Sequence, residues 1–246
     1  MSVRIMTYNV HHGTDVDDRP SLDRIAEEII ASKASIVCLQ EVDRRFGARS
    51  GHADQFTELT DRLAMNGHFG PAISAHGGQY GNAVLADGTI DAETVHLLPT
   101  PADSEPRNAT AAVISTDLGR LHVISTHLTV GPTMGMVRRR QVTALADIAA
   151  ASPLPTIVAG DFNTGARRSQ LAELEQSMTH TTRAKPWSLA RLGLLWGRPY
   201  GATFPVRRPK MRIDRIYVRG LRVTSCHVLS GGGSDHRPVV AEVDTR

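Results

Sequence analysis

Short apolar runs with the composition of β-strands recur along the whole 246-residue chain, separated by turn residues or by helix-like segments. Period-2 alternation and β-branched residues predict strands over residues 3–10, 35–43, 77–86, 94–98, 109–115, 121–127, 157–159, 212–218, 221–229 and 239–243. Apolar residues at helical spacing predict helices beginning at residue 20 and over 55–65, 136–151 and 167–177. Because strand-like runs are spread from end to end, we expect one domain over 1–246, with two mixed sheets and outer helices.

The stretch that carries the clearest chemistry follows the strand predicted at residues 157–159. Gly160 frees the backbone there, and Asp161 and Asn163 follow with one residue between them. Since successive strand side chains point to opposite faces, Asp161 and Asn163 should share one side while Phe162 packs on the other. A carboxylate and a carboxamide presented together suit metal-assisted water chemistry. They equally suit an Asx turn, which is the commoner structure for such a stretch taken alone.

Other polar residues stand at or beside the ends of apolar runs, namely Asn9, Glu41, Asn82, His127, Asp214, Asp235 and His236. Each has an ordinary structural explanation when it is considered alone. Asn9 and Asn82 can be turn residues that terminate a strand, and Asp214 can pair with Arg212 or Arg215. Half-buried carboxylates are costly unless they are paired or bound to metal, however, so several at strand ends predict convergence on one site.

The inventory of side chains narrows the chemistry of this predicted site. Oxygen ligands without cysteine favour Mg²⁺ or Mn²⁺ over structural zinc. Cys38 and Cys226 each lie inside an apolar run, which is typical of small buried hydrophobic residues. The chain contains no phosphate-binding P-loop, serine nucleophile elbow or His-Glu-x-x-His helix. Carboxylates, two histidines and a divalent cation suit hydrolysis of a phosphoester by an activated water.

The overall charge and composition set weaker limits on partners and location. A formal charge of +3 and a pI near 9.1 permit a phosphate-bearing partner, while 4% aromatic residues leave few stacking platforms for unpaired bases. The N-terminal residues lack the pattern of a signal peptide, and no apolar stretch is long enough to span a bilayer. We therefore expect a soluble cytoplasmic monomer without an obligate protein partner.

Seven short blocks, in this order, resemble the endonuclease/exonuclease/phosphatase superfamily: Thr7-Tyr8-Asn9-Val10, Leu39-Gln40-Glu41-Val42, Tyr80-Gly81-Asn82-Ala83, Ser125-Thr126-His127-Leu128, Gly160-Asp161-Phe162-Asn163, Ile213-Asp214-Arg215-Ile216 and Ser234-Asp235-His236-Arg237-Pro238. Each block is weak alone, but a chance match of all of them in order is implausible. The resemblance implies an α/β (α+β) fold of the deoxyribonuclease I-like kind. In that fold a four-layer α/β/β/α sandwich of two mixed sheets is flanked by helices, and the site lies at one edge.

The resemblance also implies roles for the residues that handle metal and water. Glu41 corresponds to the principal metal ligand, with Asn9 beside it, and Asp235 contributes to a metal site. Asp161 would orient or deprotonate the attacking water, and Asn163 would hold that water or a phosphate oxygen.

A second set of implied roles concerns the phosphate. His236 would contact the scissile phosphate, with Asp214 fixing the tautomer and orientation of its ring. His127 matches a second histidine of the deoxyribonuclease-like branch, and Glu105 stands where that branch has the supporting carboxylate. We therefore pair Glu105 with His127. Arg107 is a candidate phosphate ligand, with a surface ion pair as the equal alternative, and Asn82 is a further candidate phosphate contact.

The implied reaction is in-line attack of water on a phosphodiester, and we expect an activity of the nuclease type. Two basic runs favour it, Arg138-Arg139-Arg140 and Arg207-Arg208-Pro209-Lys210, although such runs are usually solvated faces. The alternative is a phosphodiesterase or phosphatase for a small molecule or a lipid headgroup. A non-catalytic binding protein on the same fold is disfavoured because Glu41, Asp161 and His236 are all present. Residues 179–204 show no clear period and receive no role.

Overall fold

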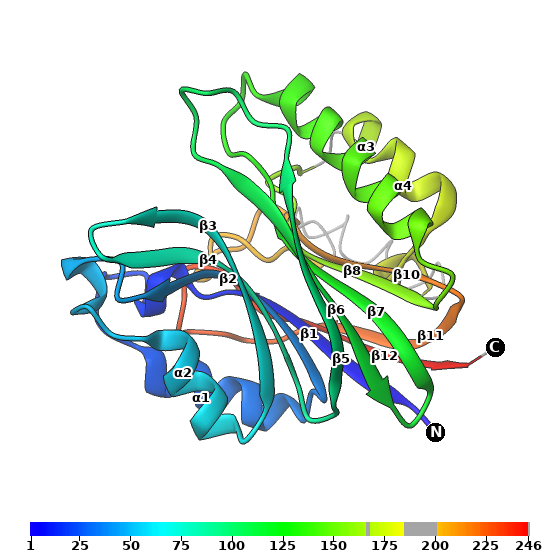
Figure 1. The fold of residues 1–246 in the computed structure, drawn as a ribbon, viewed down its shortest axis with the longest axis horizontal. Coiled ribbons are helices and arrows are strands. Elements are labelled where there is room, and N and C mark those ends of the chain that lie inside the picture. Colours follow the sequence, from blue (N-terminus) through cyan, green and yellow to red (C-terminus); the bar gives the residue numbers. More distant parts are fainter. Residues whose placement is uncertain (166–167, 185–200, 246) are drawn as a thin grey trace.

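The computed structural model describes residues 1–165, 168–184 and 201–245, which form two face-to-face mixed sheets with helices outside them (Figure 1). The first six-stranded sheet has the order β11 (Leu221–Val228), β12 (Val239–Thr245), β1 (Val3–Asn9), β2 (Ile36–Arg44), β4 (Gly78–Ala86) and β3 (Asn66–Ala75). The second has the order β5 (Ile90–Leu98), β6 (Arg107–Thr116), β7 (Gly119–His127), β8 (Thr156–Asp161), β10 (Asp214–Arg219) and β9 (Thr179–His180). This arrangement confirms the predicted sandwich.

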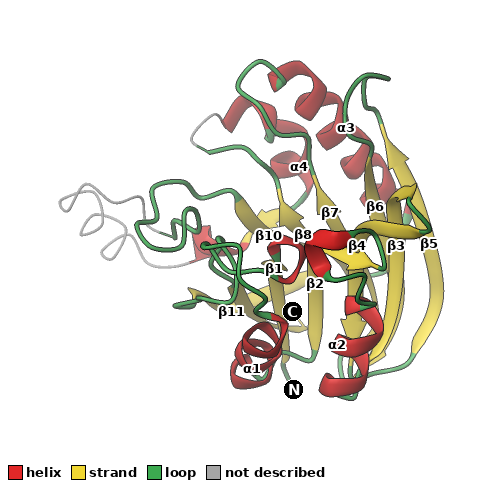
Figure 2. Ribbon diagram, turned by 90° about the vertical axis from the view of Figure 1, so that its left-hand side faces the viewer, coloured by secondary structure: helices red, strands yellow, loops and turns green. Residues whose placement is uncertain are grey.

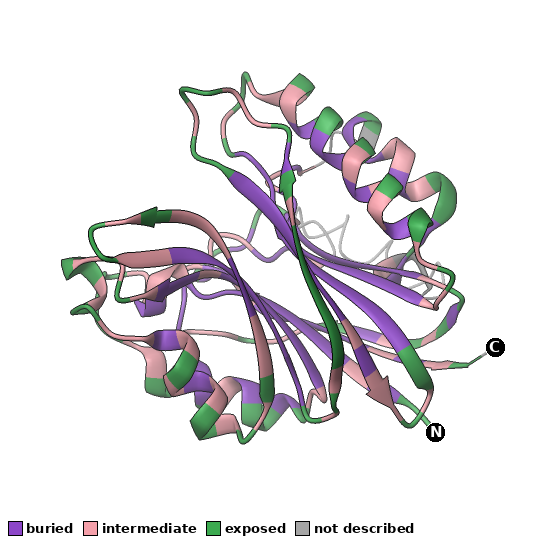
Figure 3. Ribbon diagram, in the orientation of Figure 1, coloured by how far each residue is buried: buried purple, intermediate pink, exposed green. Residues whose placement is uncertain are grey.

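Helices cover the outer face of each sheet, as Figure 2 shows. The first sheet is covered by α1 (Leu22–Ser32) and α2 (Gln55–Leu63), and the second by α3 (Gly135–Ala151) and α4 (Ala172–Ser177). Alternation along β1 explains the layering, because Ile5 faces the apolar cluster between the sheets while Met6 and Tyr8 pack toward α1. The buried faces of the strands form a continuous core through the molecule (Figure 3).

The layer between the sheets changes from apolar to polar along the strands. On β1 the inward-facing positions run from Ile5 to Thr7 and then to Asn9, all of them buried. Hydrogen bonds then join the two sheets, because Gln40 Nε2 donates to Ser125 Oγ over 3.1 Å. Since buried polar groups are expensive unless they are paired, these contacts fix how the sheets face each other at the polar end.

Two parts of the sequence prediction are wrong. Residues 66–75 form β3, which the sequence did not predict because glycines and Pro71 interrupt its alternation and the register shifts after Pro71. The helix expected over 167–177 is instead a 3₁₀ turn (Arg168–Gln170) followed by the short helix α4. Trp187 and Trp196, in the segment without a clear period, lie outside the described residues.

Two expectations about single features can be compared with the structure. Cys38 and Cys226 are both buried in the core, which confirms that they act as small core residues. Among the described residues, no helix combines the length and the apolar character that crossing a bilayer requires.

Candidate active site

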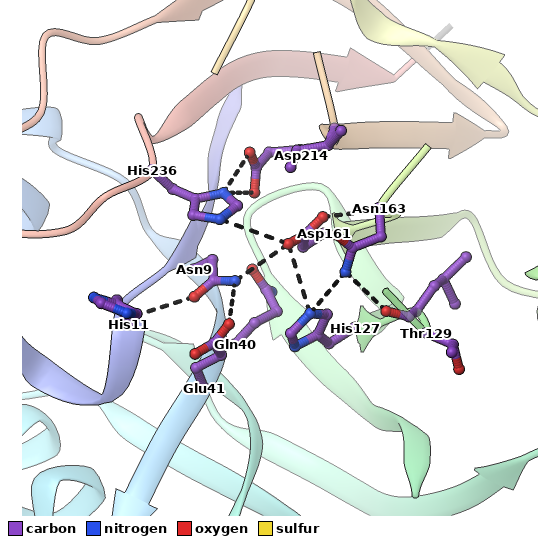
Figure 4. A network of polar contacts seen from close by, with 12 residues as sticks. Asn9, His11, Gln40, Glu41, His127, Thr129, Asp161, Asn163, Asp214 and His236 are labelled. Carbon is purple, nitrogen blue, oxygen red and sulfur yellow. Dashed lines mark hydrogen bonds and ion pairs between the residues drawn. The ribbon is translucent and has the colours of Figure 1, made fainter. Parts of the chain in front are cut away.

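Polar side chains from both sheets converge at the polar end of the sandwich (Figure 4). Asn9, the last residue of β1, lies at the centre, and its Nδ2 donates to Glu41 Oε1 over 2.9 Å and to Asp161 Oδ2 over 3.2 Å. One amide therefore connects a carboxylate of the first sheet to a carboxylate of the second. The convergence that the strand ends predict is present in the structure.

Glu41 reaches this site by a route that the sequence did not reveal. We expected it beside the end of a strand over residues 35–43, and the observed strand β2 ends at Arg44. The register passes from Leu39 opposite Ala83 to Val42 opposite Gly81, so β2 contains one extra residue at this point. Glu41 has the positive φ of 61° in this bulge. Because a bulge re-aims side chains, Glu41 turns toward Asn9 instead of following the alternation of the strand.

Asp161 ends β8, and its carboxylate is held from several directions. Oδ1 accepts a hydrogen bond of 2.8 Å from the backbone N–H of Asn163, which is an Asx turn. The turn and the site are therefore parts of one structure. Phe162 is fully buried on the other face, where its ring packs 5.3 Å from that of Tyr217. The predicted division between Asp161 and Phe162 is confirmed.

Gly160 sets the spacing between β7 and β8. A Cβ atom at this position would lie 1.9 Å from the backbone oxygen of Thr126, so only glycine allows the two strands to approach so closely. The next residues in the parallel register are His127 and Asp161, which lie opposite each other. His127 Nε2 is 3.6 Å from Asp161 Oδ2.

His236 lies on the loop before β12 and is surrounded by carboxylates. Its Nδ1 is 2.9 Å and 3.1 Å from the two oxygens of Asp214. The contact expected between Asp214 and His236 is thus present, while its role stays a prediction. Nε2 faces Asp161 Oδ2 at 3.8 Å and Asp235 Oδ1 at 3.9 Å. Burial by itself lowers the pKa of His236, but these three carboxylates together raise it to about 10, so the ring is an imidazolium at neutral pH.

The pKa values of the two central carboxyl groups, Asp161 and Glu41, are shifted in opposite directions. Burial, together with the nearby charge of Asp214, raises the pKa of Asp161 above the usual carboxyl range. Burial also favours a raised pKa for Glu41, but its contacts with His12 and Asn9 and the nearby imidazoles outweigh burial and hold that pKa below its usual range. Glu41 is therefore a permanent anion, whereas Asp161 can take up a proton near physiological pH.

The predicted pair of Glu105 and His127 is wrong, because Arg107 lies between them. Arg107 Nη1 is 3.0 Å from Glu105 Oε1 and 2.9 Å from His127 Nδ1. Arg107 is only 4% exposed, and its Nε is buried without a hydrogen-bond partner in the described part of the chain. Burial and the charge of Arg107 lower the pKa of His127 to about 3, so this ring stays neutral. Asn163 Nδ2 lies 3.0 Å from His127 Nε2 and donates to Leu128 O over 2.9 Å.

Two further predicted residues lie beside the site and not at its centre. Asn82 Nδ2 donates to Asn108 Oδ1 over 2.6 Å and thereby joins the two sheets. Its contact with phosphate stays a prediction. Asp235 lies on the His236 side and accepts a hydrogen bond of 3.3 Å from Ser234 Oγ. Its share in a metal site likewise stays a prediction.

Sequence reasoning missed residues that support these side chains. The ring of Phe204 packs against that of His236 at a tilt of 46°, with the ring centroids 4.8 Å apart, and Thr203 Oγ1 accepts the backbone N–H of Asp214 over 3.3 Å. Both belong to the segment without a clear period, so no pattern marked them. His12 also borders the site, with Nδ1 3.9 Å from Glu41 Oε2. Its only signal in the sequence was a histidine pair directly after a strand end.

The model of the endonuclease/exonuclease/phosphatase family matches residues 6–236, and the chain belongs to this family. Members of the family are hydrolases that act on phosphoester bonds. This match confirms the resemblance that the seven sequence blocks carry.

Individual relatives cover the chain almost completely. The protein YbhP of Escherichia coli strain K12 is 26% identical over 259 residues, which are 98% of this chain and 96% of YbhP. The structure of an endonuclease/exonuclease/phosphatase from Beutenbergia cavernae aligns with a TM-score of 0.81 at 20% identity, over 99% of this chain and 72% of that one. A mannosyl-6-phosphatase of Bacteroides thetaiotaomicron aligns with a TM-score of 0.75 at 17% identity, over 98% and 99% of the two chains. These structures show that the fold is shared.

Proposed function

We propose that this chain is a divalent-metal-dependent phosphodiesterase of the nuclease type, in which water attacks phosphorus in line without a covalent enzyme intermediate. The observation that supports this most directly is the environment of Asp161. The pKa of this buried carboxylate is raised, and it faces the imidazolium of His236 and the neutral imidazole of His127. It also accepts a hydrogen bond from the amide of Asn9, which donates to Glu41 as well. Groups with separated pKa values around one buried point are typical of catalytic acid and base pairs.

The donor set beside Asp161 fits a hard divalent cation. Glu41 is an anion whose Oε1 accepts a hydrogen bond from Asn9, while its Oε2 lies 3.9 Å from His12 Nδ1. We assign Glu41 as the main ligand, with Asn9 beside it and Asp235 as a further oxygen donor. Mg²⁺ or Mn²⁺ suits such oxygen ligands. A cation bound there would stabilise the charge that develops on the phosphate oxygens.

Asp161 is the group that we assign to the attacking water. Its raised pKa makes it a stronger base than an ordinary carboxylate while still leaving it ionised at mildly alkaline pH. The hydrogen bonds from Asn9 and from the N–H of Asn163 hold both of its oxygens in fixed directions. Asn163, on the same side, is placed to hold that water or a phosphate oxygen.

Two cations are available to the phosphate in this proposal. His236 keeps both ring protons, donates one to Asp214 and directs the other from Nε2 toward the space beside Asp161. Arg107 presents a buried guanidinium next to His127. Fixed positive groups in a buried site stabilise developing charge far better than they would in water. We assign both to the non-bridging or leaving oxygens.

The nuclease reading draws support from one of the two basic runs. Arg207, Arg208 and Lys210 are exposed on the loop that contains Phe204, and Val206 of this loop donates its N–H to Asp235 O over 2.7 Å. These cations thus border the site, where a polyanionic substrate would extend. The other run is different, because Arg138 is buried and donates to the backbone oxygens of Thr129 and Gly131.

A substrate panel tests the proposal. Hydrolysis of bis-p-nitrophenyl phosphate should stop with EDTA and return with Mg²⁺ or Mn²⁺, and Asp161→Asn or His236→Ala should cost orders of magnitude in rate. Plasmid DNA, single-stranded oligonucleotides, RNA, sphingomyelin and inositol phosphates should then be compared. Salt-sensitive cleavage of nucleic acid is the expected result. Turnover without metal would overturn the metal assignment, and preference for a soluble phosphomonoester would overturn the nuclease assignment.

A further inference from the structure

His12 faces Glu41 across a gap that no hydrogen bond closes. The distance from His12 Nδ1 to Glu41 Oε2 is 3.9 Å, and Nδ1 is buried without a hydrogen-bond partner in the described part of the chain. A buried polar atom left without a partner is costly. The spacing is too long for a hydrogen bond but suits two ligands of one ion, which lie about 3–4 Å apart when each is about 2.0–2.2 Å from the metal.

The position of His12 relative to Glu41 is fixed by a third residue. Gln55 Nε2 donates to the backbone oxygen of His12 over 2.6 Å, and Gln55 Oε1 accepts the N–H of Asp43 over 3.0 Å. One buried amide therefore ties the histidine loop to β2 two residues after Glu41. Gly13 makes room for this clamp, since a Cβ atom there would lie 2.4 Å from Gln55 Nε2.

The backbone also aims the two side chains at each other. His12 has a φ of 43° and Glu41 a φ of 61°, a region that residues other than glycine rarely occupy. Such conformations persist where the surroundings impose them, and they gather at functional sites. Several other non-glycine residues of this chain also have a positive φ, but at His12 and Glu41 it accompanies side chains whose atoms Nδ1 and Oε2 face each other at 3.9 Å.

We propose that His12 Nδ1 is a ligand of the cation held by Glu41. This inference rests on the proposed function in that it concerns the same metal site. It adds one imidazole nitrogen to a set of oxygen donors, and imidazole binds first-row transition ions more readily than Mg²⁺. With this nitrogen ligand, the preference of the site for Mn²⁺ and heavier transition ions over Mg²⁺ is stronger than it would be with oxygen ligands alone.

Two other roles for His12 make different predictions. In the first, protonated His12 merely pairs with Glu41, and removing it would leave cation binding unchanged or stronger, because a competing positive charge disappears. In the second, His12 binds an ion together with His11 and Asp18, since ligand atoms of these three residues lie within 4.8 Å of one another. That arrangement would depend on His11 as much as on His12.

The test uses Mn²⁺ as the probe, with binding measured by calorimetry and ligands identified by pulsed electron paramagnetic resonance. We expect the wild type to show coupling to ¹⁴N that His12→Ala loses and His11→Ala keeps. Affinity for Mn²⁺ should fall about tenfold or more in His12→Ala, and affinity for Mg²⁺ should fall less. Glu41→Gln should weaken binding of both ions. Circular dichroism verifies that each variant is folded.

The outcomes separate this inference from the proposed function. Unchanged or tighter Mn²⁺ binding by His12→Ala, nitrogen coupling that survives in it, or loss of the coupling in His11→Ala would each overturn the role of His12. Metal-dependent hydrolysis could still be observed in every one of those cases. Conversely, loss of the nitrogen signal in His12→Ala together with an absence of hydrolysis by the wild type would support the ligand and overturn only the enzyme.

Discussion

His236 and His127 both face the same carboxylate oxygen, Asp161 Oδ2, from distances of 3.8 Å and 3.6 Å, but their surroundings are opposite. His236 lies among the carboxylates of Asp214, Asp161 and Asp235, which raise its pKa to about 10 against the effect of burial. His127 lies against Arg107, and burial together with that guanidinium lowers its pKa to about 3. One imidazole is therefore a cation and the other is neutral.

The difference shows how one residue type supplies two functions at one site. His236 can donate from both nitrogens, so it suits contact with a charged phosphate oxygen. Neutral His127 carries a single ring proton, so one of its nitrogens is free to accept a hydrogen bond from the donors beside it, which are Arg107 Nη1 at 2.9 Å from Nδ1 and Asn163 Nδ2 at 3.0 Å from Nε2. The neighbouring charges thus decide the protonation state of each ring, as they do in other acid and base pairs.

The largest expected effect comes from removing the charge that supports His236. Asp214→Asn should lower the rate of phosphodiester hydrolysis about 10⁴-fold, the loss seen when the carboxylate behind a catalytic imidazole is replaced. Asp244→Asn is the matched control, because Asp244 forms an ion pair with Arg222 near the far end of β12 from His236. Steady-state kinetics with bis-p-nitrophenyl phosphate measures both. A loss below tenfold in Asp214→Asn would mean that the charge on His236 is not needed.

The pH dependence of the rate in the wild type and in Asp214→Asn sharpens this result. Below its pKa of about 10 His236 keeps its proton, so the wild-type rate should decline only as the pH rises through that value. Without the negative charge of Asp214 the pKa of His236 falls, and the alkaline decline should move to lower pH. On the acid side the rate should rise as Asp161 loses its proton, at a pH above the usual carboxyl range. An alkaline limb that stays in place would contradict the assignment of His236.

A smaller effect is expected from removing the guanidinium beside the neutral histidine, His127. Arg107→Met removes the nearby charge, so the pKa of His127 should rise, and kcat/KM should fall about 10²-fold through the loss of a phosphate contact. Nuclear magnetic resonance of the histidine ring measures the pKa directly. Arg120→Met is the control, since Arg120 pairs with Asp91 at the surface. An unchanged His127 titration would show that burial alone keeps this ring neutral.

The smallest effect should come from the aromatic residue that covers His236. Phe204→Leu keeps an apolar group but removes the ring whose centroid lies 4.8 Å from that of His236, and an aromatic contact of this kind contributes about 0.5–1.5 kcal/mol. We expect kcat to fall about two- to tenfold with little change in KM, and Phe204→Tyr to restore it. A rise in KM without a change in kcat would instead make Phe204 a substrate contact.

Most strands could be predicted because their own residues determine them. Along β1 and β8 alternate residues face the core between the sheets, and the residues between them pack against the outer helices. The edge strand β3 could not be predicted, because its pairing with β4 stabilises a stretch that glycine and Pro71 interrupt. Local preference was overridden there by a neighbour that lies later in the chain.

The site could be predicted in its residue types but not in its contacts. Asn9 and Asp161 follow from strands that point the same way, since parallel neighbours bring their carboxyl ends to one edge. The position of Glu41 depends on a bulge in β2, and that of Glu105 depends on where the guanidinium of Arg107 lies. Such features are set by packing across the two sheets, which no spacing along the sequence encodes.

The glycine before Asp161 has a consequence for how this chain can be altered or compared. Where Gly160 meets Thr126 there is no room for a Cβ atom, so the absence of a side chain at position 160 helps to set the separation of the imidazole and the carboxylate one residue further on. A related chain with any larger residue at this point would have to hold its strands, and therefore these two groups, further apart. The residue at position 160 therefore indicates how closely His127 and Asp161 can approach each other.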